Sequence, residues 1–219
     1  AELVPIRFKT DTIEYNAKAF KTREGAAVEE LLEQLPGIEV DKEGNVNAQG
    51  EAVVQVLVDG KEFFGKDPKV ATKNLPAKAI DKVQVLDRKS EQALFTGIED
   101  GERDRTINLV LKKDHKRGYF GSIKAGVGTN STYIGEAKVY RFSDQIQAAV
   151  LGLANNINQF GFTYKGNNTF GQDSKGVNNT LAGGLNLSYF KENSNRYFAS
   201  FLGNSRKRDL SEQTFSQNF

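Results

Sequence analysis

The chain has 219 residues, enough for one large or two ordinary domains, and its 30 basic and 28 acidic side chains leave a formal net charge of +2. It has no cysteine and a single histidine, which excludes disulfide frameworks, thiolate metal sites, cysteine nucleophiles and multi-histidine metal centres. The nearly balanced charge argues against a nucleic-acid-binding surface, because such surfaces cluster basic side chains on one side. No apolar run is long enough for a transmembrane helix, although membrane-spanning β-strands would carry a much weaker hydropathy signal.

The first part of the chain predicts a compact α/β unit. Residues 5–17 contain extended, partly alternating stretches. A helix is expected to begin near Thr22, because the apolar residues that follow recur at helical spacing and form one stripe. These residues are Val28, Leu31, Leu32 and Leu35. Pro36-Gly37 ends this helix, since proline cannot continue it and glycine accepts the reversed backbone. Residues 37–50 then indicate a strand, a Glu-Gly turn and a second strand.

The stretch "AVVQVLVDGKEFFG", residues 52–65, predicts a buried strand, a tight turn and a short aromatic strand. Its first part is almost continuously apolar, which is typical of a strand buried on both faces. Asp59-Gly60 suits a turn that needs positive φ. In an extended chain Phe63 and Phe64 point to opposite faces, so one can enter the core while the other contacts a neighbouring surface. The alternative is that both fill one core.

A second helix is predicted to begin at Asp67-Pro68. Aspartate is a good N-cap, and proline is well suited to the first helical position. We expect this helix to end before Leu75-Pro76, because the residue that precedes a proline avoids the α region.

Two further strands are predicted over residues 79–87 and 105–113, and the charged stretch 88–104 between them indicates a surface loop. An acidic cluster in this loop offers the carboxylate oxygens that Ca²⁺ prefers. Its members are Glu99, Asp100, Glu102 and Asp104. The interleaved arginines favour a solvated loop or internal ion pairs instead, so no metal site is assigned. No Ser-His-Asp set, glycine-rich phosphate loop or pair of catalytic carboxylates is recognisable, so the sequence predicts neither an enzyme nor a bound cofactor.

The composition changes near Gly118. The first 117 residues hold 20 basic and 22 acidic side chains, whereas the rest of the chain holds 10 and 6. Phenylalanine and tyrosine change in the other direction, from 6 before this boundary to 16 after it. We therefore predict two domains, residues 1–117 and residues 118–219, which are surrounded by different solvents.

The second part of the chain predicts five strands with period-two alternation. They cover residues 118–128, 132–142, 144–154, 181–190 and 196–204. Each has roughly ten residues, the length that crosses a bilayer at a tilt of about 45°. The apolar side chains, among them Ile123, Val127, Val139 and Val150, are expected to touch lipid. The hydrophilic side chains are expected to face a lumen, and they include Lys124, Glu136, Lys138 and Gln147.

Aromatic residues near the ends of these strands suit the girdles that flank a membrane-spanning β-sheet. They are Tyr119, Tyr133, Tyr140, Phe142, Tyr189, Phe190 and Tyr197. The basic run 204–213 could face anionic lipid, but an ordinary loop is favoured. A soluble β-sandwich is the alternative for the whole second part. The many glycine and alanine residues on the apolar face argue against it, because a sandwich core prefers larger branched side chains.

Five motifs in a fixed order resemble a known family. They are "DTIEYNAKAF", "VEELLEQLPGIEVDKEGNV", "VLVDGKEFFGKDP", "NLPAKAIDKVQVLD" and "TINLVLKKDHKRGYFG". Together they are similar to the TonB-dependent outer-membrane receptors, and most of all to the Bacteroidetes-type branch related to SusC-like proteins. The resemblance covers about residues 5 to 165. The positions of the plug motif that it includes are Pro36, Gly37, Asp59, Gly60, Phe63, Phe64 and Pro76.

The resemblance implies an α+β plug domain inside a β-barrel of about 22 strands, in the outer membrane of a Gram-negative bacterium. Such a barrel imports a substrate with energy from TonB, and in the SusC-like branch it works with a SusD-like surface lipoprotein. Its other partners are the membrane lipid and the remainder of its own barrel. No residue before Pro5 resembles a TonB box, and five strands leave unpaired edges that lipid does not tolerate. We therefore expect this chain to be a piece of a longer protein.

Two functions remain open from the sequence. In the first, the plug closes the lumen through weak polar contacts with the lumen-facing side chains, and import requires the plug to shift or partly unfold. In the second, the chain is an outer-membrane binding, signalling or assembly module without transport, and the strands serve as an anchor. The sequence names no substrate.

Overall fold

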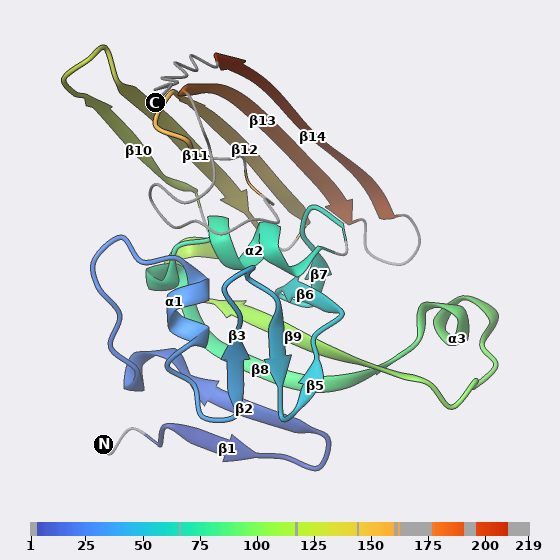
Figure 1. Ribbon diagram of the computed structural model, residues 1–219. Coiled ribbons are helices and arrows are strands. Elements are labelled where there is room, and N and C mark those ends of the chain that lie inside the picture. Colours follow the sequence, from blue (N-terminus) through green and yellow to red (C-terminus); the bar gives the residue numbers. More distant parts are fainter. Residues whose placement is uncertain are drawn as a thin grey trace, which may run out of the picture.

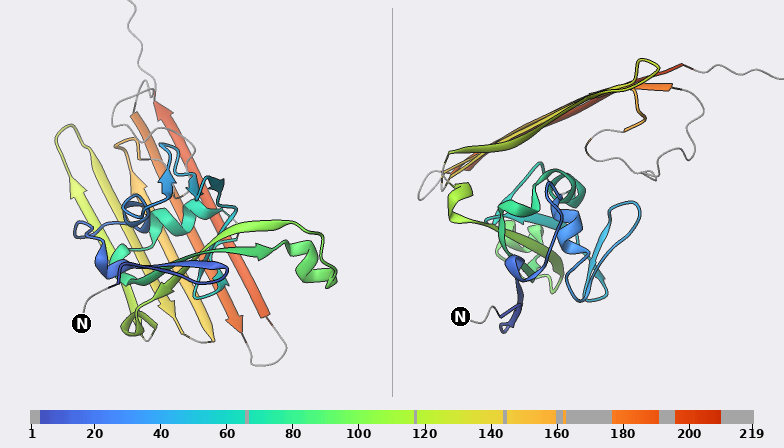
Figure 2. Two further views of the ribbon diagram at one scale, coloured as in Figure 1. Left: turned by 90° about the horizontal axis from the view of Figure 1, so that it is seen from below. Right: turned by 90° about the vertical axis from the view of Figure 1, so that its left-hand side faces the viewer.

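The computed structural model describes residues 4–65, 67–116, 118–143, 145–159, 162, 177–190 and 196–209. The described strands form a six-stranded, a five-stranded and a three-stranded sheet. The six- and three-stranded sheets, together with the helices, make up an α/β unit, here defined as residues 4–116. The five-stranded sheet forms a second layer that lies along one side of this unit (Figures 1 and 2).

The six-stranded sheet has the order β1-β2-β8-β9-β6-β7, and its only parallel pair is β6 and β9. Its strands are β1 (Ile6–Phe8), β2 (Thr12–Asn16), β6 (Gln55–Val58), β7 (Lys61–Glu62), β8 (Ile80–Lys89) and β9 (Arg103–Leu111). Alternate residues of β2, β8 and β9 fill the core, and Tyr15, Val83 and Ile107 are almost completely buried. The predicted buried strand is confirmed, since all four residues of β6 are buried.

Two short α-helices and a small sheet complete the core. They are α1 (Val28–Leu32), α2 (Pro68–Asn74), β3 (Ile38–Val40), β4 (Val46–Ala48) and β5 (Glu51–Ala52). The 3-10 turns are η1 (Ala17–Ala19), η2 (Ala77–Ala79) and η3 (Lys113–Lys116). The prediction for α2 is confirmed at both ends: the Asp67 carboxylate accepts a hydrogen bond from the Lys69 N–H at 3.0 Å, and the helix ends before Leu75-Pro76.

Predictions for the first helix and for the stretch 88–104 are wrong. The first helix begins at Val28 and not near Thr22, because Gly25 has a φ of +76° and the chain before it is irregular. It also ends at Leu32, before Pro36-Gly37, and the residues between continue as a turn. The stretch 88–104 is not a plain loop, because β8 and β9 extend into it as a hairpin and a short helix, α3 (Glu91–Thr96), lies at its tip (Figure 1). The Ser90 hydroxyl caps this helix by accepting a hydrogen bond from the Ala93 N–H at 3.0 Å.

The five-stranded sheet is an antiparallel meander in which each strand pairs with the next along the chain. Its strands are β10 (Tyr119–Val127), β11 (Tyr133–Phe142), β12 (Ile146–Asn155), β13 (Val177–Phe190) and β14 (Arg196–Asp209). All five predicted strands are confirmed. Residues 204–209 were expected in a loop and instead continue β14, because their backbone pairs with the start of β13. Residues 210–213 of that predicted loop lie outside the described residues.

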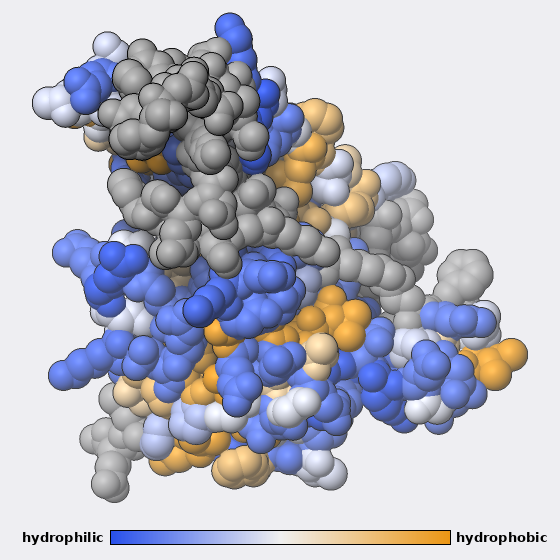
Figure 3. Space-filling view, in the orientation of Figure 1, coloured by the Kyte–Doolittle hydropathy of each residue, from blue (hydrophilic) through white to orange (hydrophobic). Residues whose placement is uncertain are grey.

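The two faces of the five-stranded sheet differ in chemistry. One face packs on the α/β unit, and the other is exposed. The exposed fraction of Ile123 is 83%, that of Val127 is 92%, that of Val150 is 51% and that of Leu185 is 55%. Exposed apolar side chains gather on part of this sheet, whereas hydrophilic side chains dominate the visible surface of the α/β unit (Figure 3). Within the described residues, no helix is long and apolar enough to span a bilayer.

Candidate functional site

The candidate site is the contact between the five-stranded sheet and the α/β unit. Its centre is a cluster of aromatic rings, to which the α/β unit contributes Phe63 and Phe64 and the sheet contributes Phe120, Tyr140 and Phe142. The Phe63 ring centroid lies 5.9 Å from that of Phe142 in an edge-to-face arrangement, and 6.3 Å from that of Tyr140. Phe63 is completely buried. Edge-to-face ring pairs contribute about 0.5–1.5 kcal/mol beyond their burial, so this cluster fastens the two layers together.

The backbone between β6 and α2 places both phenylalanines in this cluster. Asp59 and Gly60 have φ values of +49° and +75°, which confirms the predicted tight turn. Phe64 also has a positive φ, of +55°, and Gly65 follows at +82°. The chain therefore turns at Phe64 and does not continue as an aromatic strand. The reading in which the two rings point to opposite faces is wrong, and the alternative in which both fill one core is confirmed: both side chains are buried, and their ring centroids lie 4.9 Å apart.

Hydrogen bonds join the two layers on either side of the aromatic cluster. The Tyr140 hydroxyl donates to the Asn74 carbonyl at the end of α2, at 2.5 Å. The Gln147 side-chain amide donates to the Val58 carbonyl at 2.8 Å, and the Phe64 N–H donates to the side-chain carbonyl of Asn186 at 3.3 Å. The contact is thus a mixture of ring packing and buried polar bonds.

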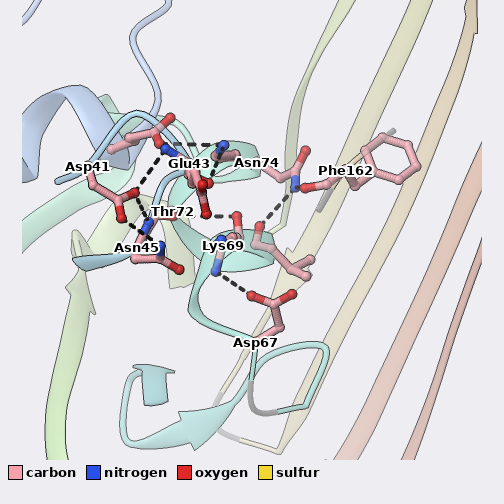
Figure 4. Close-up of polar contacts among 11 residues, drawn as sticks. Asp41, Glu43, Asn45, Asp67, Lys69, Thr72, Asn74 and Phe162 are labelled. Atoms are coloured by element: carbon pink, nitrogen blue, oxygen red, sulfur yellow. Dashed lines mark hydrogen bonds and ion pairs between the residues drawn. The ribbon is translucent and has the colours of Figure 1, made fainter. Parts of the chain in front are cut away.

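The end of α2 is tied to a second segment of the chain. The Asn74 side-chain amide donates to the Val70 carbonyl at 2.9 Å and to the Phe162 carbonyl at 3.4 Å (Figure 4). The Asn74 side chain therefore connects α2 with Phe162, which follows β12 in the chain.

The nearby Asp41 carboxylate accepts hydrogen bonds from the N–H groups of Glu43 and Asn45, and hydrogen bonding to Asn45 lowers the pKa of this carboxyl group.

Part of the contact is polar and incompletely paired. Among the described residues, five buried side-chain atoms have no hydrogen-bond partner. They are Gln147 Oε1, Thr180 Oγ1, Asn186 Nδ2, Ser188 Oγ and Lys69 Nζ. Four of these atoms lie on β12 and β13, whereas the aromatic rings of the sheet lie on β10 and β11. An unpaired buried polar group costs about 1–3 kcal/mol, so these four atoms reduce the stabilisation that the buried side chains of β12 and β13 provide.

The four side chains that were predicted to face a lumen lie on the face of the sheet that carries Tyr140. Lys124 is paired in register with Glu136, and the carboxylate of Glu136 forms an ion pair with Lys138 at 2.9 Å. Both members of this ion pair are largely buried. Among the described contacts of these four side chains, only Gln147 bonds directly to the α/β unit.

The remaining motif positions support the α/β unit from within. The Pro36 carbonyl accepts a hydrogen bond from the Tyr15 hydroxyl at 2.7 Å, and Gly37 follows it with a φ of +78°. Pro76 forms an isolated bridge with Ala27, next to the start of α1. Pro36, Gly37 and Pro76 therefore fix the fold and do not meet the five-stranded sheet in any described contact.

The acidic cluster of the β8–β9 hairpin forms local bonds. Glu99 is paired with Lys89, which lowers the pKa of that carboxyl group, and Asp100 accepts from the Ser90 hydroxyl with the same effect on its pKa. Glu102 and Asp104 continue toward and into β9. Within the part of the chain that the structure describes, no group of three or more side chains could hold a metal ion.

The sequence predicted Gln147 and the two phenylalanines of residues 63 and 64 as candidates for this contact, but it missed the other residues that join the two layers. Tyr140 and Phe142 were assigned to an aromatic girdle, but both are buried under the α/β unit. Their position on the face of Glu136 and Lys138, given by the period of two, was the signal that could have found them. Asn74 and Asn186 were not singled out, because an asparagine in a helix or strand carries no signature of a long-range partner.

The chain was compared with known proteins. No family model matches it, and a search of curated proteins finds no match. Three solved structures similar to it are the pyoverdine outer-membrane receptor FpvA and the siderophore receptor PirA, both from Pseudomonas aeruginosa, and the alcaligin outer-membrane receptor FauA from Bordetella pertussis. Their sequence identities are 16%, 14% and 14%, and their TM-scores are 0.37, 0.42 and 0.37. The matches cover 90%, 92% and 93% of this chain but only 27%, 35% and 32% of those chains.

Proposed function

We propose that this chain is the plug domain and the first wall strands of a TonB-dependent outer-membrane transporter. Residues 1–117 form the plug, and residues 118–219 begin the barrel wall. One observation carries the proposal: the five-stranded sheet buries one face against the α/β unit and leaves an apolar face uncovered. A soluble sandwich would bury that apolar face, whereas a membrane wall presents it to lipid.

The uncovered face has the composition of a surface in contact with lipid. Its side chains include Ile123 on β10, Val150 on β12, Leu185 on β13 and Phe201 on β14. Soluble monomers rarely expose contiguous apolar patches of more than a few hundred Å². The strands have 9 to 14 residues, which suffices to cross a bilayer at the tilt of a barrel wall.

The contact between the two layers is proposed to act as the closed gate. The sequence suggested weak polar contacts alone, but the aromatic cluster adds a strong attachment at β10 and β11. A pull on the plug would therefore have to separate Phe63 from Tyr140 and Phe142, and also break the incompletely paired polar contacts with β12 and β13, before a passage opens between the two layers.

The finer features of the proposal rest on the sequence motifs. They suggest the SusC-like, Bacteroidetes-type branch, with energy from TonB through a segment outside this chain and a SusD-like lipoprotein as a surface partner. The substrate is open. The chain carries no recognisable catalytic set, so the proposed role is transport and not catalysis.

Deleting the plug tests the gate with a probe that does not depend on knowing the substrate. In a Gram-negative host, removal of residues 4–116 from the full gene product should make cells sensitive to vancomycin, a large hydrophilic antibiotic. The intact protein at equal abundance in the outer membrane is the control. Unchanged resistance would favour the second candidate function, a binding, signalling or assembly module without transport.

Crosslinking tests whether the plug must move. The chain has no cysteine, so cysteines can be placed at Lys61 and Phe190, whose side chains meet across the two layers with the Lys61 ammonium 4.2 Å from the centroid of the Phe190 ring. A short bismaleimide between them should abolish growth on any nutrient for which the deletion strain is defective. The control pair, Leu185 and Phe201, joins neighbouring strands of the wall only. Normal growth with the first pair crosslinked would reject gating by movement of the plug.

A further inference from the structure

A cavity lies between the β6–β7 turn and the ends of β13 and β14. Its volume is about 410 Å³, within the range of small-molecule sites. The α/β unit supplies Lys61, Glu62 and Arg88 to its lining, and the sheet supplies Ser188 and Phe198. The cavity therefore belongs to both layers, and a bound molecule would touch each of them.

The cavity is lined by two acidic and two basic side chains, which differ in their partners. The Asp59 carboxylate is paired with Lys116 at 2.7 Å. The Gln55 side chain bridges Glu62 and Arg88. Its amide donates a hydrogen bond to the Glu62 carboxylate at 3.1 Å, and its side-chain carbonyl accepts one from the Arg88 guanidinium at 3.1 Å. Among the described contacts, this neutral side chain is the sole partner of the Arg88 guanidinium, which has five N–H donors. The cavity thus holds an arginine to which no carboxylate of the described residues is bound.

Two further features of the lining favour a ligand that is flat and polar at its edge. Ser188 lines the cavity, the residue is 1% exposed, and its buried hydroxyl has no hydrogen-bond partner among the described residues. Phe198 lines the same cavity and is 48% exposed, so one side of its ring is open. The Lys61 ammonium lies 4.2 Å from the centroid of the Phe190 ring, which adds positive charge at the cavity wall.

We propose that this cavity binds a planar organic monoanion, an aromatic carboxylate being the simplest case. Its carboxylate receives two N–H bonds from the Arg88 guanidinium, the geometry in which arginine binds carboxylates best. Its ring packs against Phe198, and a polar atom at its edge bonds to the Ser188 hydroxyl. Such a ligand neutralises the arginine and satisfies a buried hydroxyl that is otherwise unpaired. The site requires the observed packing of the two layers, but it does not depend on transport or on TonB.

The test uses 4-fluorobenzoate as the probe and fluorine NMR as the readout, with the full chain in detergent micelles. The probe should bind saturably. The neutral isostere 4-fluorobenzamide should bind about tenfold more weakly, since it lacks the charge-assisted bonds to arginine. Arg88→Gln should lower the affinity for the benzoate by a similar factor and remove the preference for it. Arg7→Gln changes an exposed arginine on β1 and should leave the affinity unchanged.

Phe198→Ala provides a second variant that does not disturb a buried group, because this ring is half exposed. It should weaken binding of the benzoate several-fold while the fold, followed by circular dichroism, is preserved. The proposal is overturned if the probe does not bind saturably, if the benzamide binds as well as the benzoate, or if both Arg88→Gln and Phe198→Ala retain the original affinity.

Discussion

The interaction energy between Phe63 and Phe142, obtained from the free energies of unfolding of single and double mutants, measures how strongly the α/β unit packs on the five-stranded sheet. Both side chains are buried, and their rings meet edge to face with centroids 5.9 Å apart. Replacing either ring by leucine keeps an apolar side chain and removes the ring pair. In a double-mutant cycle, Phe63→Leu and Phe142→Leu should therefore show a coupling energy of about 0.5–1.5 kcal/mol in the free energy of unfolding.

The assay is guanidinium unfolding in detergent micelles, followed by far-ultraviolet circular dichroism because the chain has no tryptophan. The control cycle pairs Phe63→Leu with Tyr119→Leu, since Tyr119 is 71% exposed on the opposite face of the sheet. Its coupling should be zero within about 0.3 kcal/mol. If the first cycle gives no more coupling than the control, the two layers do not pack as described and the reasoning about the gate fails.

Three further changes have defined outcomes. Tyr140→Phe removes the hydroxyl that bonds to the Asn74 carbonyl, and it should lower the free energy of unfolding by about 1–3 kcal/mol, because that buried carbonyl loses its partner. Asp67→Ala removes the cap of α2 and should cost about 1 kcal/mol in the same measurement. Hydrogen bonding to Lys82 lowers the pKa of Glu14 from 4.5 to about 2, so the ionised carboxylate stabilises the fold above pH 4.5, and this stabilisation is lost as the pH falls toward 2. Glu14→Gln should therefore remove about 3 kcal/mol of stability at pH 7 and almost none at pH 2, and an equal loss at both values would contradict this pKa.

Local chemistry made several elements predictable from the sequence. Asp67-Pro68 sets the start of α2, and Leu75-Pro76 sets its end, through steric and hydrogen-bonding rules that act within a few residues. The period of two also placed Ile123 on an exposed face and Lys138 on the other, since alternation is a property of the strand itself.

Features that depend on distant partners were not predictable in this way. The positive φ of Phe64 brings its ring next to that of Phe63, and nothing in the local sequence demands this conformation of a phenylalanine. The polar run at residues 204–209 resembles a loop, yet it forms a strand because β13 offers it a continuous partner. For the same reason only part of the candidate site could be predicted from the sequence. The alternation of the strand assigned Gln147 to the correct face, but its hydrogen bond to the Val58 carbonyl could not be predicted.

The central claim is that the uncovered face of the five-stranded sheet touches lipid, and site-directed spin labelling tests it directly. Single cysteines at Ile123, Val150 and Leu185 report on that face, and cysteines at Gln147 and Leu151 report on the buried one. In lipid vesicles, labels at the first three positions should collide with oxygen, which concentrates in the bilayer, more often than with a water-soluble nickel complex. Labels at the other two positions should be shielded from both. More frequent collisions with nickel than with oxygen at the first three positions would place this face in water and contradict the account.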